Sequence, residues 1–349
     1  MSGVIQRYRK YLDLPDLEPV SLGEGSTPLI PWSQWHNTRI WLKLEGMNPT
    51  GSFKDRGMTV AVSMARHEGA KAVICASTGN TAASAAAYAG RAGLAALVVV
   101  PQGQVTREKM LQASAYGATL LAVEGNFDAA LALVRRTADE NPAIALVNSV
   151  NPWRLRGQET GAYEVVDSLG HAPAALVIPV GNAGNISAYF QGFRRYGRGI
   201  PQMMGIQAEG ASPLVKGEFF EHPQTVASAI RIGKPASAHL AREAVAESRG
   251  RFFAVSDALI LAAQKELARG GVYVEPASAT AYAGLKQLFE MGAIPAGDVV
   301  AVLTGSGLKD GTTPLQWVDA EPVVTTADTI LSTINQLLSK KEQDAHVAH

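Results

Sequence analysis

The chain has 349 residues, 47% of them hydrophobic, and its 31 Lys and Arg residues balance its 31 Asp and Glu residues. This length allows two lobes with substantial cores, and the neutral charge balance gives no support for a nucleic-acid or membrane-surface partner. Cys75 is the only cysteine, which excludes an internal disulfide and a cysteine-based zinc site.

The first informative element follows a turn at 48–51, Asn-Pro-Thr-Gly, and is predicted to be a helix with Ser52 as its N-cap. Lys54 would lie in its first turn, facing the positive end of the helix dipole, which lowers the pKa of an amine. A partly neutral amine is what Schiff-base chemistry with an aldehyde requires. Taken alone, Lys54 is more simply explained as an exposed lysine beside Asp55 and Arg56.

From residue 71 to residue 147, β-branched runs alternate with Ala-rich helical runs. The pattern predicts strands at 71–75, 94–100, 119–123 and 144–147, and helices at 80–91, 106–116 and 127–139. This βαβ rhythm predicts a parallel sheet covered by helices.

The same rhythm resumes after residue 174. It predicts strands at 174–180, 203–208 and 299–303, and helices at 186–193, 257–269 and 329–338. Between about 210 and 250 the periodicity is weak and supports no assignment. Two lobes with a cleft between them, toward which the carboxyl ends of the strands point, are the simplest packing.

Four polar loops follow predicted strands, and the first is 76–82, Ala-Ser-Thr-Gly-Asn-Thr-Ala. It offers hydroxyls, an amide and the N–H groups of a helix start, which suit an anion such as a carboxylate. Ser, Thr and Asn are also what any helix start prefers, so simple capping is the alternative.

The second polar loop, 148–158, carries Arg154 and Arg156 a few residues after a strand. An arginine matches a phosphate with two parallel hydrogen bonds, which makes this loop a candidate phosphate site. The alternative is that both arginines are solvated or pair with Glu159 and Glu164.

The third polar loop, 178–186, combines a strand, a glycine turn and a helix start, which together form a phosphate cradle. Its spacing is not that of a dinucleotide-binding fingerprint, and a plain turn is the alternative. The fourth, 303–309, places the hydroxyl of Thr304 directly after a strand, where it could address a ring nitrogen. Its alternative is an ordinary glycine turn.

Together these loops and Lys54 describe a cleft with an aldehyde-reactive amine and at least two anion sites. Pyridoxal phosphate has one aldehyde and one phosphate and therefore fits the lysine and the glycine loop. The remaining anion sites would serve the substrate.

Other features limit the location of the protein and its use of metals. The seven histidines include no His-Glu-x-x-His pattern, so we expect no catalytic metal. The longest apolar run, 94–100, is too short to span a bilayer, and residues 1–20 lack the apolar core of a signal peptide. We therefore expect no membrane partner and a cytoplasmic protein.

The chain resembles the pyridoxal-phosphate enzymes of the tryptophan-synthase β-subunit fold, fold type II, from 22–29 (Leu-Gly-Glu-Gly-Ser-Thr-Pro-Leu) to the Thr304 loop. The segment 51–57 (Gly-Ser-Phe-Lys-Asp-Arg-Gly) and the glycine loop are shared with serine and threonine dehydratases, so they indicate the cofactor class. The segments 148–152 with Arg154, and 229–235, are similar to threonine synthases. Trp153 departs from the pattern and would either pack or narrow the entrance.

The resemblance implies a two-lobed α/β fold with parallel-rich sheets flanked by helices, and a role for each matching residue. The smaller lobe would span 58–152, and the larger, cofactor-binding lobe 1–57 and 153–349. Lys54 would hold the cofactor covalently and then transfer protons. The other cofactor contacts would come from Asn80 at the ring hydroxyl, Thr304 at the ring nitrogen, and a phosphate cradle of Gly181, Asn182, Ala183, Gly184 and Asn185. The substrate would be held by Ser77, Thr78, Thr81, Ser149 and Arg154.

The implied reaction converts O-phospho-L-homoserine and water to L-threonine and phosphate, and the implied assembly is a homodimer. A serine or threonine dehydratase is the leading alternative, and a cysteine-synthase-like replacement is another; neither needs the second phosphate site of Ser149 and Arg154. A non-catalytic carrier of pyridoxal phosphate is the alternative from a different class, although it would not need two anion sites beside the lysine.

Overall fold

The computed structural model describes residues 2–103, 107–311, 313, 317–318 and 321–347. Residues up to Gly311 form one compact unit, and the residues from Thr312 onward form a second unit. The second unit contains the helix α13 (Ile330–Val347), which runs past the end of the helix predicted at 329–338. All other elements belong to the first unit.

The larger sheet of the first unit has six strands in the order β1-β2-β10-β7-β8-β9. Every neighbouring pair is parallel except β1 and β2. The three strands predicted from 174 onward are confirmed as β7 (Ala175–Pro179), β8 (Gln202–Ala208) and β10 (Gly297–Leu303). The sequence prediction did not include β1 (Leu29–Trp35), β2 (Thr38–Leu44) and β9 (Arg251–Val255).

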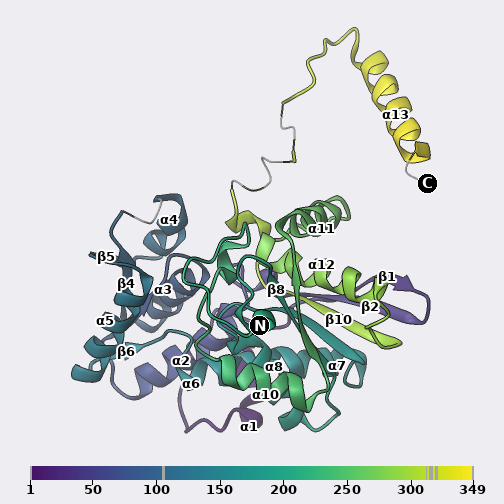
Figure 1. The fold of residues 1–349 in the computed structure, drawn as a ribbon. Helices are drawn as coiled ribbons and strands as arrows, with labels where there is room; N and C mark the ends of the chain where they lie inside the picture. The colour runs from purple at the N-terminus through teal and green to yellow at the C-terminus, as the bar shows by residue number, and fades with distance from the viewer. Residues whose placement is uncertain (1, 104–106, 312, 314–316, 319–320, 348–349) are drawn as a thin grey trace. The chain divides into compact units, whose positions relative to one another are not determined.

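Helices cover both faces of this sheet (Figure 1). On one face, Val177 and Ala301 pack with α11 (Asp257–Arg269) and α12 (Pro276–Glu290). On the other face, the neighbouring strand residues Ile178 and Val302 pack with helices of the opposite layer. These are α7 (Thr160–Leu169), α8 (Gly184–Tyr196) and α10 (Ala238–Glu247). Because both faces are buried, the central strands are apolar throughout, as expected for a parallel sheet.

The smaller sheet has four parallel strands in the order β5-β4-β3-β6. They are β3 (Ala72–Ala76), β4 (Ala95–Pro101), β5 (Thr119–Val123) and β6 (Ile144–Leu146), and all four were predicted. One face packs against α2 (Lys54–His67), α3 (Asn80–Ala92) and α4 (Arg107–Ala115), and the other against α5 (Phe127–Glu140). The helix predicted at 106–116 is confirmed from Arg107, while Thr106 lies outside the described residues.

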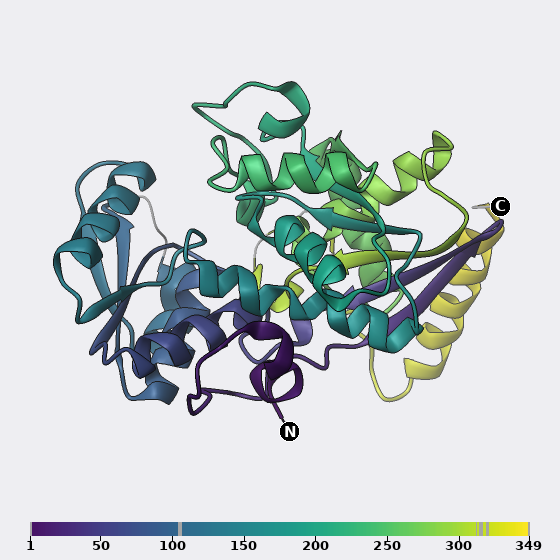
Figure 2. The same cartoon turned by 90° about the horizontal axis from the view of Figure 1, so that it is seen from below.

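The remaining elements were not predicted. The helix α1 (Val4–Leu12) packs against Val60 of α2 and Tyr163 of α7, and is seen from below in Figure 2. The helix α6 (Pro152–Gln158) lies against α2. The shorter elements are η1 (Glu45–Met47), α9 (Pro213–Lys216), η2 (Ser228–Ile230) and η3 (Gly307–Lys309).

The predicted α/β architecture is therefore confirmed, with two parallel-rich sheets flanked by helices. All strands of the smaller sheet fall between residues 72 and 146, and the larger sheet takes its strands from both sides of that range. The lobe boundaries at 57/58 and 152/153 remain a prediction. In the described part of the chain, no helix has the length and apolar character needed to cross a bilayer.

Candidate active site

A pocket of about 890 Å³ lies where the carboxyl ends of strands from both sheets meet. Its size is in the range typical of small-molecule sites. All four polar loops singled out in the sequence contribute to its wall. The lining segments include 46–51, 53–54, 76–81, 148–149, 181–186, 228–232, 304, 306 and 308–309.

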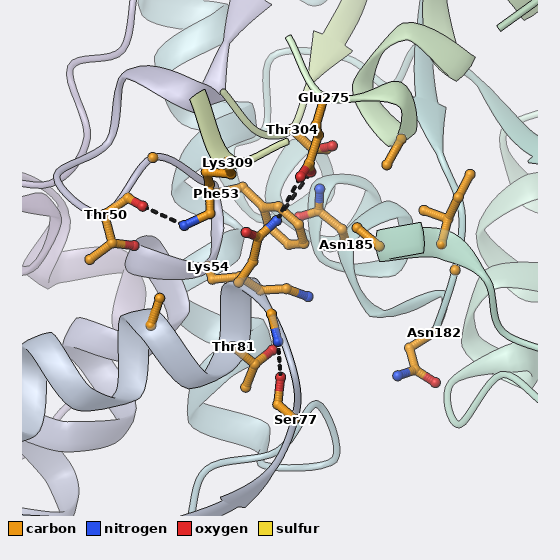
Figure 3. A pocket seen from close by; sticks show the side chains of 18 of the residues that line it. Thr50, Phe53, Lys54, Ser77, Thr81, Asn182, Asn185, Glu275, Thr304 and Lys309 are labelled. Atoms are coloured by element: carbon orange, nitrogen blue, oxygen red, sulfur yellow. Dashed lines mark hydrogen bonds between the residues drawn. The ribbon is translucent and has the colours of Figure 1, made fainter. Parts of the chain in front are cut away.

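Lys54 is the first residue of α2, and its side chain faces the pocket (Figure 3). Burial by the surrounding protein, and next the positive charge of Arg154, lower the pKa of the Lys54 amine to about 7, while Glu275 acts in the opposite direction. The direction of this pKa shift agrees with the expectation from the sequence, but burial of the amine, and not the helix dipole, is its leading cause. Near neutral pH a large share of this amine is therefore unprotonated.

The prediction that Ser52 caps α2 is wrong. Phe53 occupies the N-cap position, and the buried Ser52 hydroxyl has no hydrogen-bond partner among the described residues. The backbone is held instead by pairing with the loop after β10: Phe53 N donates to Thr304 O at 3.0 Å, and Ser306 N donates to Gly51 O at 2.9 Å. This pairing places Lys54 beside Thr304.

A buried ionic cluster anchors α2 just after Lys54. Arg56 donates to Glu45 Oε2 and to Glu164 Oε2, both at 2.6 Å, and Lys43 Nζ donates to Glu164 Oε2 at 2.8 Å. These cations hold the pKa of Glu164 well below its usual range. Because breaking such a buried cluster would leave charges uncompensated, it fixes the first turn of α2 firmly to β2 and α7.

Asn80 and Thr304 lie on different walls of the pocket, and each has a partner that the sequence analysis did not identify. Asn80 Nδ2 donates to the carboxyl of Glu275, at 3.1 Å to Oε1. Thr304 Oγ1 lies 3.2 Å from Ser278 Oγ. Glu275 and Ser278 both belong to the start of α12, for which the sequence analysis made no assignment; the Glu-Pro pair that begins it was a usable signal.

The loop after β3 brings Ser77, Thr78 and Thr81 to the pocket, and the loop after β6 brings Ser149. Ser77 Oγ accepts a hydrogen bond from Gly79 N at 3.2 Å (Figure 3). These hydroxyls and the N-terminus of α3 form one polar wall. They are suited to binding an anion.

Arg154 is completely buried and is not among the residues that line the pocket. Its Nη1 donates to Val147 O at 3.0 Å, whereas Nε and Nη2 have no partner among the described residues. Burial lowers the pKa of its guanidinium to about 10. Arg156, the weaker candidate, instead pairs with Glu159 at 3.5 Å, one of the partners that the alternative named, and also with Asp13 at 3.4 Å, which it did not name.

Trp153 does not narrow the pocket entrance. It is not a lining residue, and it packs against two of the apolar clusters around α2.

The glycine loop 181–185 lines the pocket at the start of α8. Ala183 is its N-cap with φ +67°, so the backbone turns sharply there. A Cβ at Gly181 would lie 2.9 Å from Ile230 Cα, which explains the glycine. The backbone oxygen of Asn182 accepts a hydrogen bond from Ser237 N, which ties the glycine loop to the start of α10. Both polar atoms of the buried Asn185 side chain lack partners among the described residues.

Lys309 is a second lysine in the pocket wall that the sequence analysis left without a role. Its Nζ donates to Thr50 O at 2.8 Å and also to Gln112 Oε1 of α4 (Figure 3). Lys309 thus joins the loop after β10 to the loop before Lys54 and to α4. The Lys309 amine therefore makes two hydrogen bonds, whereas the Lys54 amine makes none to another described residue.

No group of three or more His, Cys, Asp or Glu side chains suited to a metal ion occurs among the described residues. The pocket instead offers one partly neutral amine, two helix N-termini and the buried, unpaired polar atoms of Asn185. The unpaired guanidinium nitrogens of Arg154 are buried outside the pocket lining. A compound with an aldehyde and a phosphate matches the amine and the α8 loop.

Comparison with known proteins agrees with this match to a compound that has an aldehyde and a phosphate. The family described as "Pyridoxal-phosphate dependent enzyme" matches residues 20–305. A threonine synthase from Halalkalibacterium halodurans is 51% identical over 92% of this chain and 94% of its own length. Those from Synechocystis sp. and Mycobacterium tuberculosis are 54% and 52% identical, over 88% and 90% of this chain and 83% and 90% of their own lengths.

Two solved structures share the fold at low sequence identity. Maize serine racemase superposes with a TM-score of 0.74 at 19% identity, covering 99% of this chain and 100% of its own. The processed form of threonine deaminase isoform 2 from Solanum lycopersicum gives 0.72 at 22% identity, covering 84% of this chain and 87% of its own.

Proposed function

The chain belongs to the threonine synthases within the pyridoxal-phosphate dependent enzymes, and we propose that it converts O-phospho-L-homoserine and water to L-threonine and inorganic phosphate. It is a pyridoxal-phosphate-dependent lyase. The observation that carries the proposal is the partly neutral Lys54 amine lying in one pocket with two separate sets of anion-binding groups.

The residues present fit pyridoxal phosphate. Lys54 would bind its aldehyde, Asn80 would donate to its ring hydroxyl, and Thr304 would face its ring nitrogen. The backbone N–H groups of 181–185, at the positive end of the α8 dipole, would bind its phosphate. When bound, the cofactor supplies an electron sink for the carbanion chemistry that the reaction requires.

A hydroxyl at Thr304 suits a modest electron sink. The ring nitrogen would face a neutral side chain, because Thr304 carries a hydroxyl and its Oγ1 is hydrogen-bonded to another hydroxyl, that of Ser278. An acidic partner at this place would protonate the ring nitrogen more firmly than Thr304 does.

Lys54 is the proposed acid–base residue as well as the cofactor anchor. With a pKa of about 7 its free amine can accept the proton from the substrate's α-carbon and return it later at nearly equal cost. The ionic cluster around Arg56 and Glu164 keeps the start of α2 in place during these transfers.

The second set of anion-binding groups would hold the substrate. Ser77, Thr78 and Thr81 at the start of α3 would bind its carboxylate and part of its phosphate. Ser149 and Arg154 would complete the phosphate site. Arg154 supports this role because two buried, unpaired guanidinium nitrogens are costly and would gain charge-assisted hydrogen bonds from an anion.

We further propose that the enzyme is cytoplasmic, as expected from its sequence, and works as a homodimer, as the family resemblance implies. The division into a smaller lobe, 58–152, and a larger lobe, 1–57 with 153–349, is part of this proposal.

The test is to incubate the purified, cofactor-loaded protein with O-phospho-L-homoserine and to measure released phosphate and L-threonine together. Equal amounts of both are expected from the wild type and from Lys216→Ala, a surface control, and neither from Lys54→Ala. If neither product forms with the wild type, while L-serine or L-threonine yields a keto acid and ammonia, the dehydratase reading replaces this one.

A further inference from the structure

Glu275 directly precedes α12, and its side chain faces the pocket (Figure 3). Only 8% of the residue surface is exposed. Its two carboxyl oxygens lie 3.1 Å and 3.3 Å from Asn80 Nδ2. A Cβ at Gly305 would lie 2.4 Å from Glu275 Oε1, so the carboxyl packs directly on the Gly305 backbone and needs a glycine there.

The same turn of α12 also holds the Thr304 loop. Glu275 N donates to Gly305 O at 3.2 Å, and Gly305 N donates to Ser278 Oγ at 2.7 Å. Ser278 Oγ in turn lies 3.2 Å from Thr304 Oγ1. One helical turn therefore contacts both residues that the proposed function places at the two polar atoms of the cofactor ring.

We propose that Glu275 is a positioning residue that orients the Asn80 amide so that Asn80 donates a hydrogen bond to the ring hydroxyl of the cofactor. This inference rests on the role proposed above for Asn80. Burial raises the pKa of Glu275, and above that pKa the ionised carboxyl only accepts hydrogen bonds, so it selects the amide rotamer whose nitrogen faces it. One N–H of Asn80 Nδ2 is then used by Glu275, and the second is left for the ligand. Without Glu275 the amide can turn by half a rotation and present Oδ1, which would repel the ring oxygen.

The charged groups around Glu275 do not provide an alternative partner for its carboxyl. Lys54 and Lys309 act on it electrostatically, as does Asp310 with the opposite sign, and burial raises its pKa. Among the described residues, the carboxyl of Glu275 forms no ion pair with either lysine, and the side chain that donates a hydrogen bond to it is Asn80.

Substitution of Glu275 tests its effect on Asn80. Glu275→Gln keeps an acceptor oxygen for Asn80 but adds an amide donor, so it selects the Asn80 rotamer less strictly, whereas Glu275→Ala removes the partner altogether. Because a hydrogen bond to the ionised ring hydroxyl favours that form, and ionisation of an aromatic hydroxyl moves its absorption to longer wavelength, Asn80 orientation has a spectroscopic signature.

The experiment titrates cofactor-free protein with pyridoxal phosphate, without substrate, and follows the absorption band of the bound cofactor. The dissociation constant and the band position are measured for the wild type, Glu275→Ala, Glu275→Gln, Asn80→Ala and the Glu275→Ala/Asn80→Ala double variant. Glu290→Gln, at the far end of α12, is the control. Thermal unfolding of each cofactor-free variant establishes that it is folded.

We expect Glu275→Ala to weaken cofactor binding about tenfold and to move the band to shorter wavelength. Glu275→Gln should fall between the wild type and Glu275→Ala in both affinity and band position, because its amide can accept from Asn80 Nδ2 or donate to Asn80 Oδ1. The double variant should bind no more weakly than Asn80→Ala alone, because Glu275 acts through Asn80.

Two results would overturn the proposal. Additive losses in the double variant would show that Glu275 acts independently of Asn80, and a Glu275→Ala variant with wild-type affinity and band would show that Asn80 keeps its orientation without the carboxyl. An Asn80→Ala variant with unchanged affinity and band would reject the role of Asn80 itself, and with it this inference. Binding by the wild type with no effect of either residue would leave the cofactor assignment intact.

Discussion

Asn148 and Ala76 are joined by two hydrogen bonds that continue the pairing of β6 and β3 past the end of β6 to the last residue of β3. Asn148 Nδ2 donates to Ala76 O at 2.9 Å, and Ala76 N donates to Asn148 Oδ1 at 3.0 Å. One side chain therefore ties the loop that carries Ser77 to the loop that carries Ser149.

Asn148→Ala should loosen both halves of the substrate site at once. Leaving the buried Ala76 N–H and C=O unpaired is expected to cost about 2–3 kcal/mol of unfolding free energy. The KM for O-phospho-L-homoserine should rise about tenfold, with a smaller change in kcat, because the lost contacts serve substrate binding. Steady-state kinetics and denaturant unfolding measure the two effects.

Asn141→Ala is the matched control, since its amide caps a turn at Ala143 far from the pocket lining. It should leave KM unchanged. An Asn148→Ala variant with wild-type KM would show that the two loops do not depend on this bridge.

Arg154→Met should make the protein more stable and nearly inactive. The substitution replaces a buried cation that has two unpaired nitrogens, Nε and Nη2, with an apolar side chain of similar length, and such replacements are commonly neutral or stabilising. Turnover of O-phospho-L-homoserine should fall by about a hundredfold or more, because each charge-assisted hydrogen bond lost costs about 1.5–3 kcal/mol. Thermal unfolding and phosphate release check the two outcomes.

Arg156→Met is the control, because Arg156 is paired with Asp13 and Glu159 outside the pocket. It should keep most of the activity. If Arg154→Met instead retained turnover, the substrate phosphate would have to bind elsewhere.

The depressed pKa of Lys54 should appear in the pH dependence of stability. The unfolded chain keeps the Lys54 proton up to its ordinary pKa of about 10.4, whereas the folded, cofactor-free protein releases it near pH 7. Between these values the unfolded state binds more protons, so the unfolding free energy should rise with pH relative to a variant without this amine.

Denaturant unfolding of cofactor-free wild type and Lys54→Met at pH 6, 7, 8 and 9 gives this difference, and the other titrating groups cancel in it. The stability of the wild type relative to the variant should increase from pH 7 to pH 9. A difference that does not change with pH would mean that Lys54 titrates normally.

Most strands of the two sheets were predictable, because runs such as β3, β4, β7, β8 and β10 are apolar and bounded by turns. The edge strand β1 was not, because Pro31, Ser33 and Gln34 interrupt its apolar residues and much of it is partly exposed. The helix α12 was missed for the opposite reason. It is buried on nearly all sides, so its Ala-rich sequence carries no amphipathic period.

The residues of the site can be divided in the same way, into those that the sequence predicted and those that it did not. Ser77, Ser149, Gly181 and Thr304 each come after a strand, and the ends of parallel strands converge, so their meeting in one pocket could be expected. Glu275 follows no predicted strand and was missed. The complete burial of Arg154 depends on how α6 packs against α2, which local sequence does not encode.

The central claim is that Lys54, and not the neighbouring Lys309, is the amine that binds the cofactor. Borohydride reduction of the cofactor-loaded protein makes the link between amine and aldehyde permanent, and peptide mass mapping then locates it. We expect the added mass on the peptide that contains Lys54, and its loss in Lys54→Ala. A label on Lys309, or on a lysine outside the pocket, would contradict the account.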